Sequence, residues 1–398
     1  MANTLNLGNG NWATKEDSLL AYNSENGNFK PLPFDFSRDS SATVVNKAGL
    51  IETVVSGIPR IDFRDDSKGA LLLEPQRTNY DSESLNFTTS FMSNSSGIQS
   101  SSLTSKIAPN GSNDSVYKIT KATDNSDPYL GRSGVSFTDT KMVFSAWLWT
   151  DENQSKDVLF LVYRDGTQEV QTKNITLTTT PTRYFIEATF TTTPSNVSYR
   201  IDLDGVSSNQ YIYAWGKQLE QGSYPTSYIP TQGSVVTRLA DVCNQSNIPT
   251  SVINSSEGVL YAEIKKDKGS QFSLISLDKS SDSANYVYVG YLNNTTSLRA
   301  QIKVDSVTVL DENINIGDTN VFSKVAVKYK SGDYAFFING SKVGNTSTST
   351  DSFSNGDLDR LEFGYNLSSS FKYYGLIKNV KLHNQALTDQ ELINLTTI

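Results

Sequence analysis

The chain has 398 residues, more than a single hydrophobic core usually organises, so two or three domains are expected. Its formal net charge is −8 and no cluster of lysine and arginine interrupts this balance, which argues against nucleic acid as a partner. With one cysteine (Cys243) and one histidine (His383), the chain cannot form an intrachain disulfide, a Ser-His-Asp triad or a His/Cys zinc site.

Residues 1–88 contain short apolar runs between turns rich in glycine and asparagine, such as Pro59–Phe63 and Ala70–Leu73. None of these runs is long enough to enclose a core alone, so the segment is expected to pack against neighbouring chains or the following domain. The polar start, Met1–Leu7, resembles neither a signal peptide nor a membrane span. We interpret residues 1–88 as an attachment and assembly region and expect no membrane insertion.

Residues 89–235 carry runs in which apolar and polar residues alternate, the pattern of half-buried strands. The expected strands are Val116–Ile119, Met142–Trp149, Val158–Tyr163, Arg183–Phe190, Val197–Leu203 and Tyr211–Trp215. Their spacing predicts an antiparallel β-sandwich of the jelly-roll type. Residues 236–256 lack this periodicity and are expected to form a linker.

Residues 257–398 repeat the alternating pattern and predict a second antiparallel sandwich, so the fold class is all-β with two tandem sandwiches. Asn339-Gly340 is expected to form the turn of a hairpin. Thr388 and Glu391 have the spacing of a capping box, which predicts one short helix near the end of the chain.

Three stretches resemble recurring pieces of bacteriophage virion proteins. The ordered series Phe36–Asn46, Gly49–Glu52, Pro59–Phe63 and Leu71–Asn79 resembles the N-terminal segment of phage tail and head fibre proteins. Trp215–Thr231 resembles the closing strand and exit loop of carbohydrate-binding jelly-roll modules in those proteins. Leu361–Gly364, Tyr374–Asn384 and Ala386–Leu392 are similar to the C-terminal half of concanavalin-A-like, laminin-G-type domains. That family implies a curved two-sheet sandwich that commonly binds glycans and in some branches cleaves them.

Glycan binding needs a flat aromatic ring against the sugar and a few planar polar groups for its hydroxyls. In the first sandwich, Trp147 and Trp149 alternate with Phe144, Ala146 and Leu148, so one set fills the core and the other faces outward. The alternative role for any of these aromatic residues is a packed core or a subunit interface. The candidate ligand residues are Trp149, Tyr163 and Arg164 in the first sandwich, and Tyr286, Tyr288, Tyr365, Tyr373 and Tyr374 in the second.

Two acidic clusters invite further hypotheses. Asp357, Asp359 and Glu362 have the spacing of the Glu-x-Asp-x-x-Glu strand of concanavalin-A-like glucanases and resemble it, with aspartate in place of the first glutamate. We expect no catalysis there and no cofactor in the chain. Asp202 and Asp204 could hold Ca²⁺, although an ordinary Asp-Gly turn explains them better. His383 is expected to alternate with buried Leu382 and to face outward.

Together these features predict a non-catalytic fibre or spike protein of a phage particle, with the virion as its location. Its expected partners are further copies of itself, with a trimer as the expected state, other phage structural proteins bound by residues 1–88, and host surface glycans. Three alternatives remain. The first is a capsid-decorating or tail-scaffold protein that binds no glycan, and the second is a polysaccharide depolymerase that uses Asp357, Asp359 and Glu362. The third is a secreted bacterial adhesin, against which the missing signal peptide argues.

Overall fold

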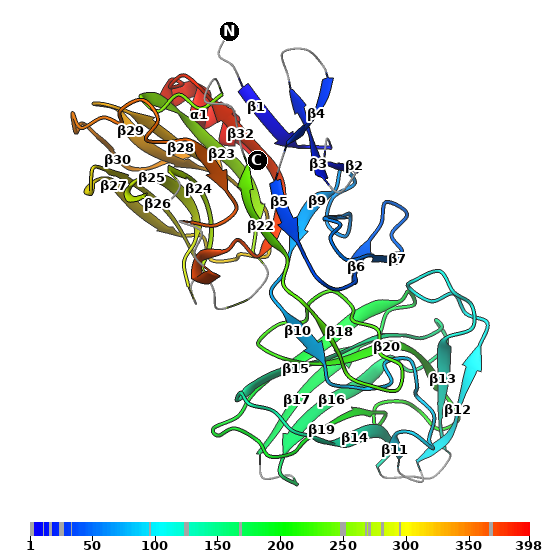
Figure 1. Ribbon diagram of the computed structural model, residues 1–398. Helices are drawn as coiled ribbons and strands as arrows, with labels where there is room; N and C mark the ends of the chain where they lie inside the picture. Colours follow the sequence, from blue (N-terminus) through cyan, green and yellow to red (C-terminus); the bar gives the residue numbers. More distant parts are fainter. Residues whose placement is uncertain are drawn as a thin grey trace. The chain divides into compact units, whose positions relative to one another are not determined.

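The computed structural model describes residues 4–10, 12–15, 18–23, 28–32, 34–94, 97–122, 127–166, 169–246, 252–266, 269, 272–279, 282–293, 296–365 and 369–398. The chain divides into two compact units. Unit 1 consists of residues 1–47, 54–75 and 239–398, and unit 2 of residues 48–53 and 76–238. Nearly all of the regular secondary structure in the described part of the chain is β-strand (Figure 1), as predicted from the alternating sequence pattern.

Unit 2 is built from two five-stranded antiparallel sheets. In spatial order, the first contains β11 (Ser93–Asn94), β14 (Tyr129–Val135), β19 (Val197–Asp202), β16 (Asp157–Arg164) and β17 (Glu169–Thr176). The second contains β12 (Ile98–Thr104), β13 (Val116–Lys121), β20 (Tyr211–Gln221), β15 (Lys141–Trp149) and β18 (Thr182–Thr189). A separate short ribbon pairs β10 (Arg77–Asn79) with β21 (Val236–Arg238). Phe144 of β15 stacks on Tyr199 of β19 in the core, so the two sheets pack as a sandwich.

Unit 1 is a second and larger sandwich. Its seven-stranded sheet contains β27 (Val307–Asn315), β26 (Ser297–Val304), β25 (Asp282–Tyr291), β24 (Ser273–Lys279), β31 (Arg360–Glu362), β22 (Val242–Ser246) and β5 (Phe34–Ser37). The main path of its eleven-stranded sheet contains β2 (Ala13–Lys15), β3 (Ser18–Asn23), β1 (Thr4–Gly8), β32 (Gly375–His383), β23 (Glu257–Lys265), β28 (Ser323–Lys330), β29 (Tyr334–Ile338) and β30 (Ser341–Ser347). The remaining strands of that sheet are β4 (Asn28–Leu32) beside β3, and β9 (Ala70–Leu73) with β8 (Arg60–Asp62) beside β32.

The N-terminal strands complete unit 1 and do not form a separate region. β1 pairs with β32 in the register Leu5↔Leu382, and β9 pairs with the start of the same strand. Residues 1–88 are therefore divided between the two units and do not form one compact region, while their expected role in attachment stays a prediction. Short strands that cannot enclose a core alone have satisfied their backbone edges by joining the sheet formed by the end of the chain. Two further short strands are β6 (Ala42–Val45) and β7 (Ile51–Val54).

The local signals near the end of the chain are confirmed. Helix α1 (Asp389–Thr396) begins after Thr388, whose hydroxyl accepts the Glu391 N–H while the Glu391 carboxylate accepts the Thr388 N–H. Asn339 and Gly340 both have positive φ angles, 47° and 80°, as the turn between β29 and β30 requires. A short 3₁₀ turn, η1 (Ser369–Phe371), precedes β32. No helix among the described residues has the length and apolar character needed to cross a membrane.

Candidate functional site

The outer face of the seven-stranded sheet in unit 1 carries a cluster of aromatic rings. Along β25, Val287 and Val289 point into the sandwich core, and Tyr286 and Tyr288 therefore project from the opposite face. The two tyrosine rings stack with centroids 5.4 Å apart, and Tyr365 packs edge-on against both. We call this cluster the tyrosine face; its members are Phe272, Tyr286, Tyr288, Tyr365 and Phe371.

Burial divides the tyrosine face into two layers. Tyr286 and Tyr288 are only 4% and 6% exposed, so they form a floor that a ligand cannot reach directly. Tyr365, Phe371 and Phe272 pack over that floor and remain partly exposed. The rings available for stacking on a ligand are therefore Tyr365, Phe371 and Phe272, and the centroids of Tyr365 and Phe371 lie 5.6 Å apart.

Polar side chains of the neighbouring strands border the aromatic floor. Tyr286 donates its hydroxyl hydrogen to Gln301 Oε1 at 2.6 Å. Arg299 binds Asp311 through two bonds, Nε to Oδ1 at 2.6 Å and Nη2 to Oδ2 at 2.5 Å, and Gln301 Nε2 donates to Asp311 Oδ2 at 3.0 Å. The Arg299 guanidinium lowers the pKa of Asp311, so this carboxyl stays ionised at neutral pH. The cluster thus offers planar donors and acceptors next to an aromatic surface, the arrangement that suits a sugar.

Two of the three acidic side chains considered for catalysis, those of Asp357 and Glu362, make structural contacts. Glu362 is buried and lies 3.3 Å from Arg360 Nη2, while Arg360 Nε donates to buried Asp278 at 2.6 Å. Asp357 accepts the Ser354 N–H at 2.7 Å, which closes a turn before β31. Asp359 donates its backbone N–H to the Asp278 carbonyl oxygen at 3.0 Å. Glu362 and Arg360 thus form an ion pair within strand β31, and Asp357 belongs to the turn that leads into this strand.

The candidates in unit 2 do not meet in one site. Trp149 is 3% exposed and packs on Tyr213 in a buried outer cluster of β15 and β20, so it cannot stack on a ligand. Tyr163 lies on the other sheet and accepts a hydrogen bond from Arg200 Nε at 3.1 Å. Arg164 is held by Glu169 at 2.9 Å and Asp165 at 3.1 Å. The face assignment itself is as expected, because Phe144, Ala146 and Leu148 fill the core.

Other predicted residues take structural places. Tyr373 is fully buried and donates its hydroxyl hydrogen to the Lys265 carbonyl oxygen at 3.0 Å, which removes it from any ligand surface. Tyr374 is half-buried, and its backbone exchanges hydrogen bonds with the Ser273 hydroxyl. His383 alternates with buried Leu382 as expected but is itself only half-exposed, and burial lowers its pKa to about 4. Asp202 Oδ1 accepts the Asp204 N–H at 2.9 Å, the contact of an ordinary aspartate turn.

No group of three or more His, Cys, Asp or Glu side chains among the described residues is arranged to hold a metal ion. Cys243 is buried in the core of unit 1.

The stretch Trp215–Thr231 holds its own loop in place. Glu220 accepts the Thr226 N–H at 3.1 Å, and Gln218 Oε1 accepts the Ile229 N–H at 2.6 Å. Both side chains are buried in strand β20, where a polar residue must find a partner. In this stretch, Gln218 and Glu220 therefore serve to accept hydrogen bonds from backbone N–H groups of the exit loop.

A buried ion network in unit 1 was not anticipated from the sequence. Asp241 binds Arg38 Nη1 at 2.9 Å, contacts Arg60 Nη2 and accepts the Glu74 N–H at 2.8 Å. Arg60 Nη1 also donates to Glu74 Oε2 at 2.8 Å. All four side chains are at most 1% exposed. Its sequence signal is the placement of single charged residues within or beside apolar runs, such as Arg60 in Pro59–Phe63.

Comparison with known proteins places a recognisable domain in unit 1. Residues 244–393 match the family model described as the Concanavalin A-like lectin/glucanases superfamily. No curated protein matches the chain.

Several solved structures resemble parts of the chain at low identity. The CBM40 module of a Ruminococcus gnavus IT-sialidase, bound to α2,6-sialyllactose, is 16% identical, with 35% of this chain and 83% of that chain covered and a TM-score of 0.29. The CBM22-1–CBM22-2 tandem of Paenibacillus barcinonensis Xyn10C is 11% identical, with 79% and 99% covered and a TM-score of 0.29. Domains LG4-5 of the mouse laminin α1 chain are 10% identical, with 67% and 92% covered and a TM-score of 0.24.

The family match agrees with the sequence resemblance of residues 361–392. Residues 244–393 therefore form a domain like those of the concanavalin A-like lectins and glucanases.

Proposed function

We propose that the chain is a non-catalytic, glycan-binding protein whose tyrosine face in unit 1 takes a surface polysaccharide. The observation that supports this most strongly is the pairing of a partly exposed Tyr365 with the Arg299–Gln301–Asp311 cluster. An aromatic ring covers the apolar face of a pyranose, and a bidentate arginine–carboxylate pair presents donors and acceptors to neighbouring hydroxyls.

The absence of catalysis belongs to the same proposal. Glycosidic cleavage uses two carboxyl groups that flank the scissile bond with different tasks. Here Glu362 is buried in an ion pair with Arg360, and Asp357 closes a turn, so neither side chain is presented to a substrate. If the wild-type chain releases reducing ends from a bound polysaccharide and Glu362→Gln abolishes that release, the chain is a depolymerase instead.

We further propose that the protein works in a bacteriophage particle as a head or tail fibre, as an oligomer with three copies as the expected number. The ordered sequence resemblance of residues 36–79 and 215–231 supports this assignment. Repeated copies would raise the avidity of a weak glycan site without any new contact. Immunogold labelling of intact particles with an antibody against unit 1 tests it, because a fibre protein places label at a fixed distance from the particle surface.

Glycan binding is tested with the full chain on a glycan array, followed by calorimetry on the best ligand. Tyr365→Ala and Asp311→Ala should each weaken binding about tenfold, since each removes one favourable contact. Asp318→Ala is the matched control, because Asp318 is an exposed aspartate of unit 1 whose side chain only accepts the Asn320 N–H. Firm incorporation into particles together with no glycan bound would instead favour a decorating or scaffold protein.

A further inference from the structure

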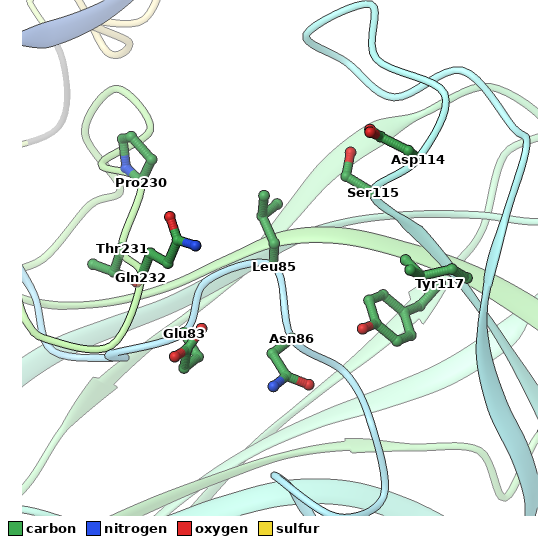
Figure 2. A pocket seen from close by; sticks show the side chains of 10 residues that line it. Glu83, Leu85, Asn86, Asp114, Ser115, Tyr117, Pro230, Thr231 and Gln232 are labelled. Atoms are coloured by element: carbon green, nitrogen blue, oxygen red, sulfur yellow. The ribbon is translucent and has the colours of Figure 1, made fainter.

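Unit 2 contains a pocket that the tyrosine face does not use. Its volume is about 490 Å³, within the range of sites for small ligands. Four segments line it: those around Glu83, Tyr117 and Thr231, which Figure 2 labels, and strand β12 through Leu103. Leu85 and Leu103 supply the apolar part of its wall, and Asn86, Asp114 and Gln232 supply polar groups.

Several polar groups of the pocket lack a protein partner. The carboxylates of Glu83 and Asp114, the Asn86 Nδ2 amide and the Tyr117 hydroxyl make no hydrogen bond or ion pair with any residue that the structure describes. Asn86 Oδ1, by contrast, already accepts the Thr88 N–H at 3.0 Å, so the amide is oriented with its donor side unused. The pocket therefore presents two acceptor carboxylates, a hydroxyl and an oriented N–H donor.

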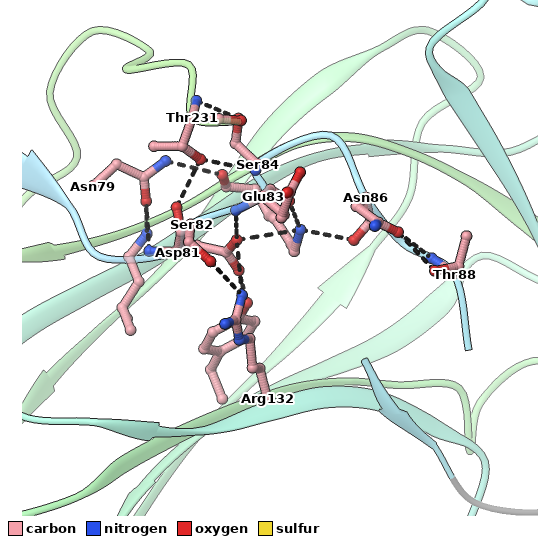
Figure 3. A network of polar contacts seen from close by, with 12 residues as sticks. Asn79, Asp81, Ser82, Glu83, Ser84, Asn86, Thr88, Arg132 and Thr231 are labelled. Atoms are coloured by element: carbon pink, nitrogen blue, oxygen red, sulfur yellow. Dashed lines mark hydrogen bonds and ion pairs between the residues drawn. The ribbon is translucent and has the colours of Figure 1, made fainter. Parts of the chain in front are cut away.

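A network of polar contacts holds the two lining segments around Glu83 and Thr231 in place (Figure 3). Asp81 accepts the Glu83 N–H at 2.8 Å and contacts Tyr199, Arg132 and Lys217. Ser84 and Thr231 lock the two lining loops together, because the N–H of each donates to the hydroxyl of the other at 2.9 Å. A pocket whose walls are fixed before binding loses little entropy when a ligand enters.

The side chains that line the pocket give it a negative charge, which favours a cationic ligand. No lysine or arginine lines it. The ammonium of Lys217 is fully buried, and there it pairs with Asp81 and donates to the Asn86 carbonyl oxygen at 2.8 Å. Lys217 partly offsets the negative charge of Glu83 but cannot extend into the pocket. Two carboxylates at the surface of the pocket are thus left for a cationic ligand group.

We propose that this pocket binds a sugar carrying a free amino group. The ammonium would lie against Glu83, and the ring hydroxyls would bond Asn86 and Tyr117 while Leu85 and Leu103 cover the apolar ring atoms. Asp114, on the opposite side of the pocket from Glu83 (Figure 2), would add to the negative charge that favours a cation. Charge-assisted bonds are about twice as strong as neutral ones, so the free amine should be preferred over its acetylated form. This site is independent of the tyrosine face and goes beyond the function proposed for it.

The test uses calorimetry of the full chain with a disaccharide of glucosamine and its N,N′-diacetylated counterpart. The free amine should bind about tenfold more tightly, and Glu83→Gln should remove that preference while leaving the melting temperature unchanged. Glu152→Gln is the matched control, because Glu152 is an exposed carboxylate of unit 2 outside the pocket. Asp311→Ala should leave the preference intact, which separates this site from the tyrosine face.

Three results would overturn the proposal. The first is equal or no binding of the two disaccharides, and the second is an equal loss in Glu83→Gln and Glu152→Gln. The third is binding of a trilysine peptide as tight as that of the amino sugar, which would identify an ammonium site for peptides.

Discussion

The buried ion network of unit 1 yields a quantitative prediction for Asp241→Asn. The aspartate carboxylate neutralises two guanidiniums at once, those of Arg38 and Arg60, and also accepts the Glu74 N–H. Although burial alone would lower the pKa of Arg60, Asp241 and Glu74 raise that pKa above its ordinary value, so the arginine remains charged. The substitution therefore leaves two buried cations with the single carboxylate of Glu74.

Breaking a buried ion pair by removing one partner costs about 3–5 kcal/mol, because the remaining charge stays desolvated. Two cations each lose the contact with Asp241 here, although Arg60 keeps Glu74, so the upper part of that range is expected. Since a domain is stable by about 5–15 kcal/mol, the loss is a large fraction of the stability of unit 1. The asparagine keeps the shape of the side chain, which separates the effect of charge from that of a cavity.

The assay is urea denaturation of the full chain, followed by hydrogen–deuterium exchange of peptides from each unit. In the variant, peptides from residues 54–75 and 257–266 should lose protection at a lower urea concentration than in the wild type. Peptides from residues 127–166 of unit 2 should lose protection at the same urea concentration in both proteins. Asp311→Asn is the matched control, because its pair with Arg299 is 41% exposed at the aspartate and should cost less than about 1 kcal/mol. If both substitutions cost the same, the network is not desolvated and the reasoning fails.

Three further changes in unit 1 test local features by the same denaturation measurement. Thr388→Ala removes the capping box of α1 and should cost about 1 kcal/mol; a Thr388→Ser variant should retain most of the stability. Gly290→Ala places a Cβ against the Ser273 carbonyl oxygen of the adjacent strand and should cost about 1–3 kcal/mol, whereas no loss would mean that β24 and β25 can separate locally. His383 has a folded-state pKa of about 4, below its unfolded value of about 6.5. Protonation in this pH range therefore favours the unfolded state, so the stability present above pH 6.5 is lost as the pH falls toward 4. The total effect is up to about 3 kcal/mol, and His383→Gln should remove that part of the pH dependence.

Local signals in the sequence predicted local structure well. The alternation at residues 142–149 identified the strand β15 and the two sets of residues on its opposite faces, and the Thr388–Glu391 spacing identified the helix start. These features depend on neighbours within a few residues, which a single sequence displays directly.

Long-range pairings and burial could not be predicted in the same way. Nothing near Leu5 indicates that its strand will pair with the strand of Leu382, because that register depends on residues far along the chain. The packing of the tyrosines was equally impossible to predict from the sequence. Alternation correctly directed Tyr286 away from the core, but only the structure shows that Tyr365 covers it and that Tyr373 turns inward. A period of two assigns a face and leaves open what packs on that face.

The residues that resemble other proteins in sequence are not the residues that we propose to bind ligands. Arg38, Arg60 and Glu74 of the N-terminal series are buried in the ion network, and Gln218 and Glu220 of the second stretch hold their own loop. Such polar residues are costly to replace one at a time, because each leaves a buried partner unsatisfied. Most polar side chains of the tyrosine-face rim and of the pocket in unit 2 carry a smaller penalty, since they are partly or fully exposed. Proteins that share the buried residues should therefore share this architecture while differing at the rim and pocket positions, and hence, under the proposed function, in the glycans that they bind.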